Sequence, residues 1–207
     1  MGVGCLDNFD SGFPGYRGKI ARSAGTVAEM LRAHGYRNYM TGKWHVTPLY
    51  ETGPTGPLDG WPLARGFDRY YGFLDAETDQ YAPELVRDNT HVAAPSTFAE
   101  GYHLTEDLAD ESIRMLAEHR AGVPDTPWFL YFAPGACHAP HQVAKEIIDE
   151  YDPMFADGWD SARDRRLERQ IEIGVVPAGT ELPERNPWVK PWAELPADEQ
   201  RVGQRLQ

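Results

Sequence analysis

The chain has 207 residues, of which 41% are hydrophobic and 25% are charged, close to the averages for globular proteins. This composition excludes a disulfide-stapled mini-protein, a wholly disordered chain and a fibrous repeat. The formal charge is 20 − 32 = −12, which argues against nucleic acid as a partner because phosphate binding needs a basic surface. No signal peptide is visible at the start, and the longest apolar run, Trp128 to Ala133, is too short to cross a bilayer. We therefore expect no membrane association and a cytoplasmic location for the chain as given.

A helix followed by a strand is predicted early in the chain. Ser23 is expected as the N-cap, and Gly35 ends the helix. The apolar spacing i, i+3, i+4, i+7 predicts one face made of Val27, Met30, Leu31 and His34. A strand over Tyr36 to Met40 follows at once, and a helix, a glycine turn and a strand in this order form half of a βαβ unit.

A second helix and a second strand are predicted after a long irregular region, 41–103. Thr105 is expected as the N-cap of the helix, with Leu108 and Met115 on its apolar face. The strand, Trp128 to Phe132, is a continuous apolar run, which is typical of a parallel strand buried on both faces. Three further helices are predicted, over 145–151, 160–173 and 198–207, and a proline-rich irregular stretch over 175–196.

Cationic and proton-transferring side chains follow the first predicted strand. Lys43 and His45 are two residues apart, so in an extended segment they point to the same side while Trp44 packs on the core. A fixed cation beside an imidazole suits a tetrahedral oxyanion such as sulfate or phosphate. The alternative is a surface lysine and a loop histidine without a chemical role.

Two histidines follow the second predicted strand. A histidine at the position of His138 can protonate a leaving group near neutral pH, because the unperturbed imidazole pKa is about 6.5. His138 and His141 could instead ligate a metal, although no HExxH frame or nearby Cys/Asp set completes such a site. The alternative is a pair of loop histidines in a proline turn. Both cysteines, Cys5 and Cys137, are expected to be free and buried thiols.

Three segments taken in order resemble the arylsulfatase branch of the sulfatase family, within the alkaline phosphatase superfamily. They are SAGTVAEMLRAHGYRNYMTGKWH (23–45), RGFDRYYGF (65–73) and the stretch 127–167 that begins PWFLYFAPGACHAPH. The resemblance implies an α/β fold: part of an alkaline-phosphatase-like mixed, largely parallel sheet flanked by helices, with long irregular loops. It also implies that 1–207 is part of a sulfatase catalytic domain, with 1–174 as the α/β core portion and 175–207 as a proline-rich extension and truncated helix.

The resemblance implies a role for each residue of the two motifs. Lys43 would bind the sulfate and the hydrate of the catalytic aldehyde, and His45 would accept a proton from that hydrate as sulfate leaves. His138 would contact the sulfate and protonate the leaving oxygen. His141 would line the substrate pocket. The small-molecule substrate would be a sulfate ester.

The sequence departs from the family at the nucleophile and at the metal. Sulfatases make formylglycine from Cys or Ser in a C/S-x-P-S/A-R signature, but Cys5 is followed by Leu6-Asp7-Asn8. They also bind a divalent cation, usually calcium, through an aspartate pair and a later Asp-Asn pair. Asp88-Asn89 falls between the two histidine segments, in the wrong order, and is interpreted as a loop turn. We therefore expect calcium and formylglycine in a longer parent protein, no metal ligands in this chain, and no turnover by the chain alone.

Two other functions remain open at this stage. A phosphonate or phosphate ester hydrolase of the same superfamily would use a similar cation-lined site. A non-catalytic remnant that binds an anion or another protein would keep the fold without the chemistry.

Overall fold

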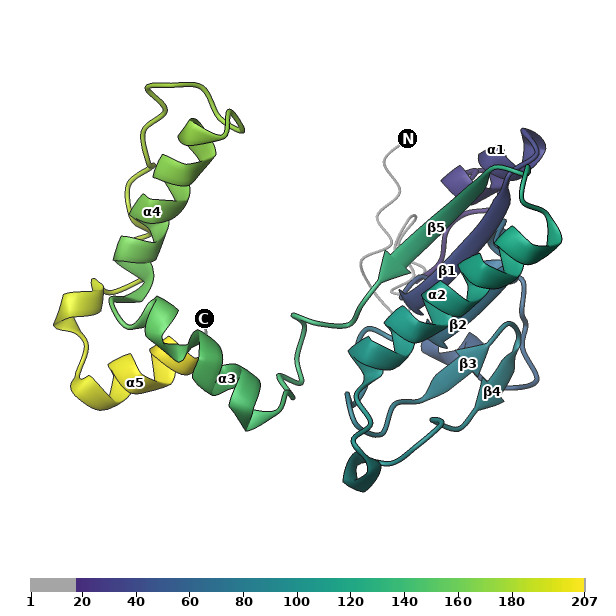
Figure 1. Cartoon of the computed structure of the whole chain (residues 1–207), viewed down its shortest axis with the longest axis horizontal. Helices are drawn as coiled ribbons and strands as arrows, with labels where there is room; N and C mark the ends of the chain where they lie inside the picture. The colour runs from purple at the N-terminus through teal and green to yellow at the C-terminus, as the bar shows by residue number, and fades with distance from the viewer. Residues whose placement is uncertain (1–17, 207) are drawn as a thin grey trace. The chain divides into compact units, whose positions relative to one another are not determined.

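A five-stranded sheet organises the first of two compact units, Met1–Gln142. In the computed structural model, which describes residues 18–206, the strands lie in the order β4-β3-β2-β1-β5 (Figure 1). Their bounds are β1 Arg37–Lys43, β2 Arg69–Phe73, β3 Leu85–Arg87, β4 Thr90–Val92 and β5 Trp128–Ala133. β1 pairs in parallel with both β2 and β5, whereas β3 is antiparallel to its two neighbours. The expected mixed, largely parallel sheet is thus confirmed.

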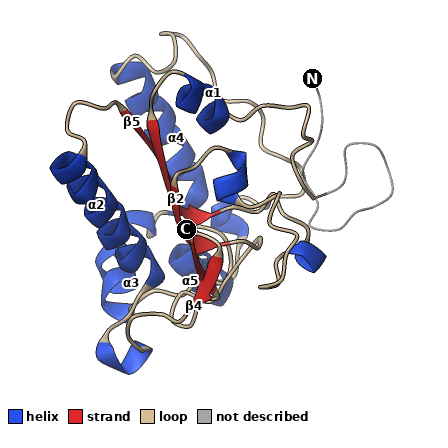
Figure 2. Cartoon of the chain, turned by 90° about the vertical axis from the view of Figure 1, so that its right-hand side faces the viewer, coloured by secondary structure: helices blue, strands red, loops and turns tan. Residues whose placement is uncertain are grey.

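Helices cover the two faces of this sheet. Successive strand residues point to opposite faces: Met40 packs in the cluster with Ala28 of α1 (Val27–Ala33), whereas Tyr39 packs in the cluster with Leu108 of α2 (Leu104–Gly122). Figure 2 shows the sheet nearly edge-on, with α2 on one side and α1 on the other. Each helix therefore buries its apolar side chains against a different face of β1.

The start of α1 differs from the prediction. The N-cap is Thr26 rather than Ser23, because the Thr26 hydroxyl accepts from the Glu29 backbone N–H while the Glu29 carboxylate accepts from the Thr26 N–H. This reciprocal pair starts the helix three residues later than expected. The predicted apolar face is also wrong, since Val27 and Met30 are exposed and Ala28 is the buried residue. The end is as predicted, with Gly35 at a φ of +84° after the helix.

The prediction for α2 is confirmed except at its first residue. Leu108 and Met115 are fully buried on one face, as the spacing predicts. The N-cap is His103, whose Nδ1 accepts from the Thr105 N–H at 3.2 Å. Thr is preferred over His as an N-cap residue, so the prediction placed the N-cap at Thr105, two residues after its observed position.

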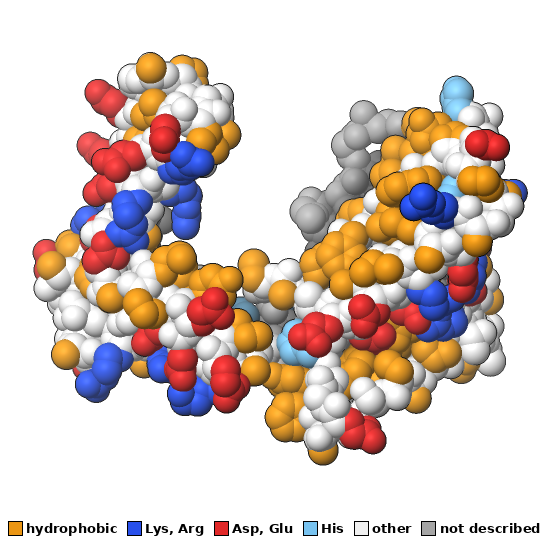
Figure 3. All heavy atoms as spheres, viewed as in Figure 1, with side chains coloured by type: hydrophobic (Ala, Val, Ile, Leu, Met, Phe, Trp, Pro, Cys, Tyr) orange, Lys and Arg blue, Asp and Glu red, His pale blue; other side chains and the backbone are white. Residues whose placement is uncertain are grey.

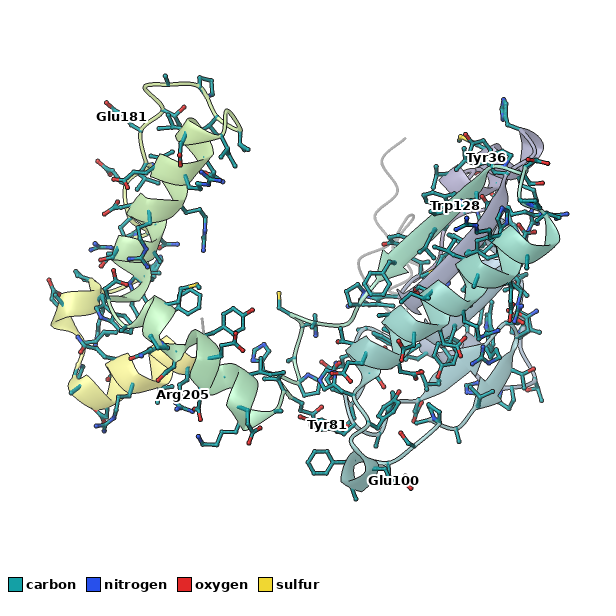
Figure 4. All side chains as sticks on the ribbon, in the orientation of Figure 1. Tyr36, Tyr81, Glu100, Trp128, Glu181 and Arg205 are labelled. Carbon is teal, nitrogen blue, oxygen red and sulfur yellow. The ribbon has the colours of Figure 1, made fainter. Side chains whose placement is uncertain are left out.

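β5 lies at the edge of the sheet and is not buried on both faces, contrary to the prediction. Among residues 18–206 it pairs with β1 alone. Trp128, Tyr131 and Phe132 are 49%, 46% and 42% exposed, and hydrophobic side chains line this strand at the surface (Figures 3 and 4). The apolar run correctly indicated a strand, but it does not distinguish a strand with two neighbouring strands from a strand with one.

The region expected to be irregular, 41–103, contains the short strands β2, β3 and β4. β3 and β4 have three residues each, too few for an alternating pattern to stand out. Asp88 lies at the turn between them with a φ of 57° and accepts from the Arg69 side chain and the Tyr70 N–H. The interpretation of Asp88-Asn89 as a loop turn is therefore confirmed.

The second unit, Val143–Gln207, is helical. Its α-helices are α3 Lys145–Tyr151, α4 Gly158–Glu172 and α5 Ala197–Leu206, close to the predicted ranges. Trp192 packs edge-to-face on Trp159 with ring centroids 4.8 Å apart, and Arg205 pairs with Asp149 at 3.0 Å. The two compact units divide after Gln142, and α4 packs against α5 within the second unit. No helix in the described part of the chain is long and apolar enough to span a membrane.

Candidate active site

Lys43 is the last residue of β1, at the carboxyl end of the strand. Ligands of open α/β sheets bind beyond these ends. The Lys43 side chain is partly buried and forms no ion pair with any residue in 18–206. Its positive charge is therefore available to an anion from solution, which distinguishes it from Lys19, whose ammonium is 2.6 Å from Glu51.

Trp44 anchors the segment after Lys43 in the core. Its side chain is 9% exposed, and its Nε1–H donates to the Gly60 carbonyl at 2.9 Å and to the Thr47 hydroxyl at 3.0 Å. The expected inward direction of Trp44 is confirmed. The ring fixes the backbone on which the flanking Lys43 and His45 are carried.

His45 departs from the extended conformation that the sequence analysis assumed. Its φ is 52°, in the left-handed region that non-glycine residues rarely adopt. Its backbone N–H donates to the Leu74 carbonyl at 3.1 Å, just as the Trp44 N–H donates to Phe73. These bonds hold the strained residue at the end of β2, and such strain is typical of functional sites.

The environment of His45 joins the three predicted catalytic residues. Burial lowers the pKa of the His45 imidazole, and the positive charge of Lys43 lowers it further. His138 acts in the same direction, whereas the carboxylate of Asp75 raises the pKa. Lys43 and His138 therefore each lie within electrostatic reach of His45, and the lowered pKa of His45 favours its neutral imidazole at neutral pH.

His138 lies in the loop after β5 and is about half exposed. Its Nδ1 is 2.8 Å from the Ala139 carbonyl oxygen, so Nδ1 carries the hydrogen because a carbonyl only accepts. The same nitrogen is 3.6 Å from Oε2 of Glu77. In the neutral tautomer Nε2 is thus unprotonated and available for proton transfer. His141 is exposed, and its side chain forms no hydrogen bond or ion pair within residues 18–206.

Asp75 and Glu77 are the residues at this site that sequence reasoning missed. Both follow β2, at the same edge of the sheet as Lys43, and they reach His45 and His138 respectively. The signal was present in the sequence: once Arg69 to Phe73 is assigned as a strand, polar residues after its carboxyl end become site candidates.

The described residues do not fit the metal expected for a sulfatase. No group of three or more His, Cys, Asp or Glu side chains in 18–206 could hold a metal ion. Cys137, beside His138, is free as expected but is exposed rather than buried, and Cys5 lies outside the described residues.

Comparison with known proteins identifies the family. The model of the sulfatase family matches residues 6–202. An uncharacterized sulfatase of Schizosaccharomyces pombe is 26% identical over 94% of this chain and 36% of its own length. An arylsulfatase of Klebsiella aerogenes is 25% identical over 97% of this chain and 43% of its own length. The chain thus spans less than half the length of either relative.

Solved structures agree in fold. The crystal structure of Ps i-CgsB in complex with k-i-k-neocarrahexaose superposes with a TM-score of 0.52 at 22% identity, over 64% of this chain and 31% of that one. At this identity the likeness concerns the fold alone. With the family match over nearly the whole chain, the chain belongs to the sulfatase family.

Proposed function

We propose that Lys43, His45 and His138 form the sulfate-binding and proton-transferring part of a sulfuric ester hydrolase. The observation that carries the proposal is the arrangement of Lys43: a strand-end ammonium without an ion-pair partner among the described residues, within electrostatic reach of His45, which His138 also reaches. An anion held there would replace the missing counter-charge. Membership of the sulfatase family supports sulfate as that anion.

The three side chains divide the work by their chemistry. The Lys43 ammonium neutralises charge on the sulfate oxygens and holds them in place. When the bond from sulfur to the alcohol oxygen breaks, protonated His138 donates a proton to that oxygen, so that an alcohol leaves rather than an alkoxide. His45 is suited to accept a proton, because its lowered pKa keeps the imidazole neutral.

The nucleophile and the metal must come from residues outside 18–206. The family supplies a covalent nucleophile and a divalent cation, and neither has a matching group in the described part of the chain. Without a nucleophile there is no covalent intermediate. We therefore propose that the chain carries the lysine and histidine part of the active site of a longer sulfatase and has no turnover alone.

The proposed substrate is a small-molecule sulfate ester. Relatives of the chain include an arylsulfatase of Klebsiella aerogenes and an N-acetylgalactosamine-6-sulfatase of Rattus norvegicus, 27% identical over 63% of this chain. One relative is named for aryl sulfates and the other for the sugar N-acetylgalactosamine. A phosphate ester hydrolase is the competing proposal, since a lysine and two histidines bind either oxyanion.

Equilibrium binding to the 207-residue chain tests the proposal. Calorimetric titration with sulfate is expected to show one site, and Lys43→Ala is expected to weaken it about tenfold or more, as for the loss of a charged hydrogen-bond partner. Lys145→Ala, an exposed lysine of the second unit, is the matched control. Equal sulfate affinity in both variants would overturn the proposal. Preference for phosphate over sulfate would favour the phosphate ester hydrolase.

A further inference from the structure

A cavity of about 390 Å³ opens next to the candidate active site, within the first unit. Phe73, Leu74 and Val86 give it an apolar wall, formed by the end of β2 and by β3. The remaining lining residues are Thr52, Asp75, Glu77, Thr78, Asp79, Ala82, Glu84 and His91. The volume fits one sugar-sized or aryl-sized group, the scale of small-molecule pockets.

Two residues belong to both the cavity and the active site. Glu77 lines the cavity and lies 3.6 Å from His138, the proposed acid for the leaving oxygen. Asp75 lines the cavity and acts on His45. A sulfate ester bound at Lys43 would therefore have the cavity beside the oxygen that carries its alcohol.

Hydrogen bonds hold the cavity loop in place. The Asp79 carboxylate accepts from the Tyr81 and Ala82 N–H groups and from the side chain of Gln142. Gln142 in turn accepts from the Gln80 N–H at 2.8 Å. Tyr81 packs on Phe98 with ring centroids 4.6 Å apart. The loop that bears Glu77 is thus tied to the segment that bears His138, which favours a preformed pocket.

The charge of the cavity wall is one-sided. Four carboxylates line it, from Asp75, Glu77, Asp79 and Glu84, and the described lining residues include no Lys or Arg. The Asp79 carboxylate already accepts hydrogen bonds from backbone groups of its own loop. The side chains of Glu77 and Glu84 are exposed at the cavity wall. Carboxylates accept hydrogen bonds from hydroxyl and ammonium groups, and they repel a second sulfate or carboxylate.

We propose that this cavity receives the alcohol part of the ester and selects an alcohol rich in hydrogen-bond donors, such as a hydroxylated or amine-bearing ring, without a second anionic group. This inference rests on the proposed function for its place in the reaction. Lys43 then takes the one anionic group of the substrate, and Glu77 and Glu84 discriminate among the alcohols.

Three pyranose probes of equal size and different charge test the inference: D-glucosamine, D-glucose and D-glucuronate. Each is titrated into the ¹⁵N-labelled 207-residue chain, and amide shifts are followed at Glu77, Thr78, Ala82 and Glu84. The expected order of affinity is glucosamine, then glucose, then glucuronate. Glu77→Gln combined with Glu84→Gln is expected to weaken glucosamine about threefold to tenfold, since two exposed charges are lost. The control is Glu106→Gln combined with Asp110→Asn, which removes two exposed carboxylates of α2.

Each result is decisive for the cavity alone, because none of the probes carries sulfate. Equal affinity for glucosamine and glucuronate, or the same glucosamine affinity in the two double variants, would overturn the inference. An absence of shifts at these four amides with all three probes would overturn it as well. Loss of sulfate binding at Lys43 would refute the proposed function but would leave the three-probe result unchanged.

Discussion

Gly42 of β1 lies so close to Ala133 of β5 that a Cβ atom on Gly42 would stand 1.9 Å from the Ala133 carbonyl oxygen. The two residues are register partners in the parallel pairing that precedes Lys43. Gly42 also has a φ of +104°, which an L-residue with a side chain rarely adopts. The close pairing of β1 with β5 just before Lys43 therefore requires glycine at position 42.

We expect Gly42→Ala to destabilise the fold by about 3 kcal/mol or more, because the added methyl group forces β1 and β5 apart. Gly35→Ala is the matched control: Gly35 also has a positive φ, of +84°, but nothing lies within 4 Å of an added Cβ. Gly35→Ala should lower the free energy of unfolding by about 1–2 kcal/mol, because it only forces an L-residue into the left-handed backbone conformation. Urea unfolding measures both, and similar losses for the two variants would contradict the packing argument.

Trp44→Phe tests the anchor of the catalytic segment. The variant removes the donor that serves Gly60 and Thr47 in a buried place, and we expect a loss of about 1–2 kcal/mol in the free energy of unfolding. Trp188→Phe, at a side chain that is 91% exposed, should change stability by less than about 0.5 kcal/mol. A neutral Trp44→Phe variant would show that the indole hydrogen bonds do not hold this loop.

His45 makes stability depend on pH. Burial and Lys43 lower its folded-state pKa below the unfolded value, so the unfolded chain binds the proton more readily. The contribution of His45 to stability is therefore complete above pH 6.5 and is lost as the pH falls below it. We expect His45→Asn, a residue tolerant of positive φ, to lose less stability than the unmodified chain between pH 7.5 and 5.5. Identical pH dependence of the two unfolding free energies would refute this.

Glu111 gives a second pH-dependent contribution, away from the active site. Ion pairs with Arg87 at 2.7 Å and with Arg114 lower the pKa of the Glu111 carboxyl to about 2. Its stabilisation is complete above the unfolded pKa of about 4.5 and is lost as the pH falls from there toward 2. Both arginines are about one-third exposed, so we expect Glu111→Gln to cost about 1–2 kcal/mol at pH 7 and nothing below pH 2.

Glu106→Gln is the control for the Glu111 prediction. Glu106 is an exposed residue of the same helix, α2, and its variant should stay within about 0.5 kcal/mol of the unmodified chain. The comparison uses urea unfolding at pH 7 and at pH 3. A Glu111→Gln variant as stable as Glu106→Gln at pH 7 would show that solvent screens the ion pairs.

Local signals in the sequence predicted the longer elements well. Apolar periodicity placed the buried face of α2 at Leu108 and Met115, and the run from Trp128 placed β5. The same local signals failed for strands whose formation or burial depends on contacts with residues distant in the sequence. The three-residue strands β3 and β4 are held by hydrogen bonds to each other, and no local sequence pattern marks them. The exposure of β5 follows from its place at the edge of the sheet, which the pattern of apolar residues along the chain does not specify.

The residues of the candidate site that belong to sequence motifs were predicted, and the others were not. Lys43, His45 and His138 were predicted from their places after strands and from the family resemblance, and Lys43 and His138 each lie within electrostatic reach of His45. Glu77 was missed because its relation to His138 joins segments 61 residues apart in the sequence. The left-handed backbone of His45 was missed because histidine adopts this conformation only occasionally, so the residue type alone does not predict it.

The position of a bound oxyanion tests the central claim most directly. Selenate has the shape and charge of sulfate, and its selenium gives an anomalous X-ray signal. A crystal of the 207-residue chain soaked in selenate should show a peak within hydrogen-bonding distance of Lys43 Nζ, flanked by the rings of His45 and His138. A fully occupied selenate elsewhere on the chain, with none at Lys43, would contradict the assignment of these residues to a sulfatase active site.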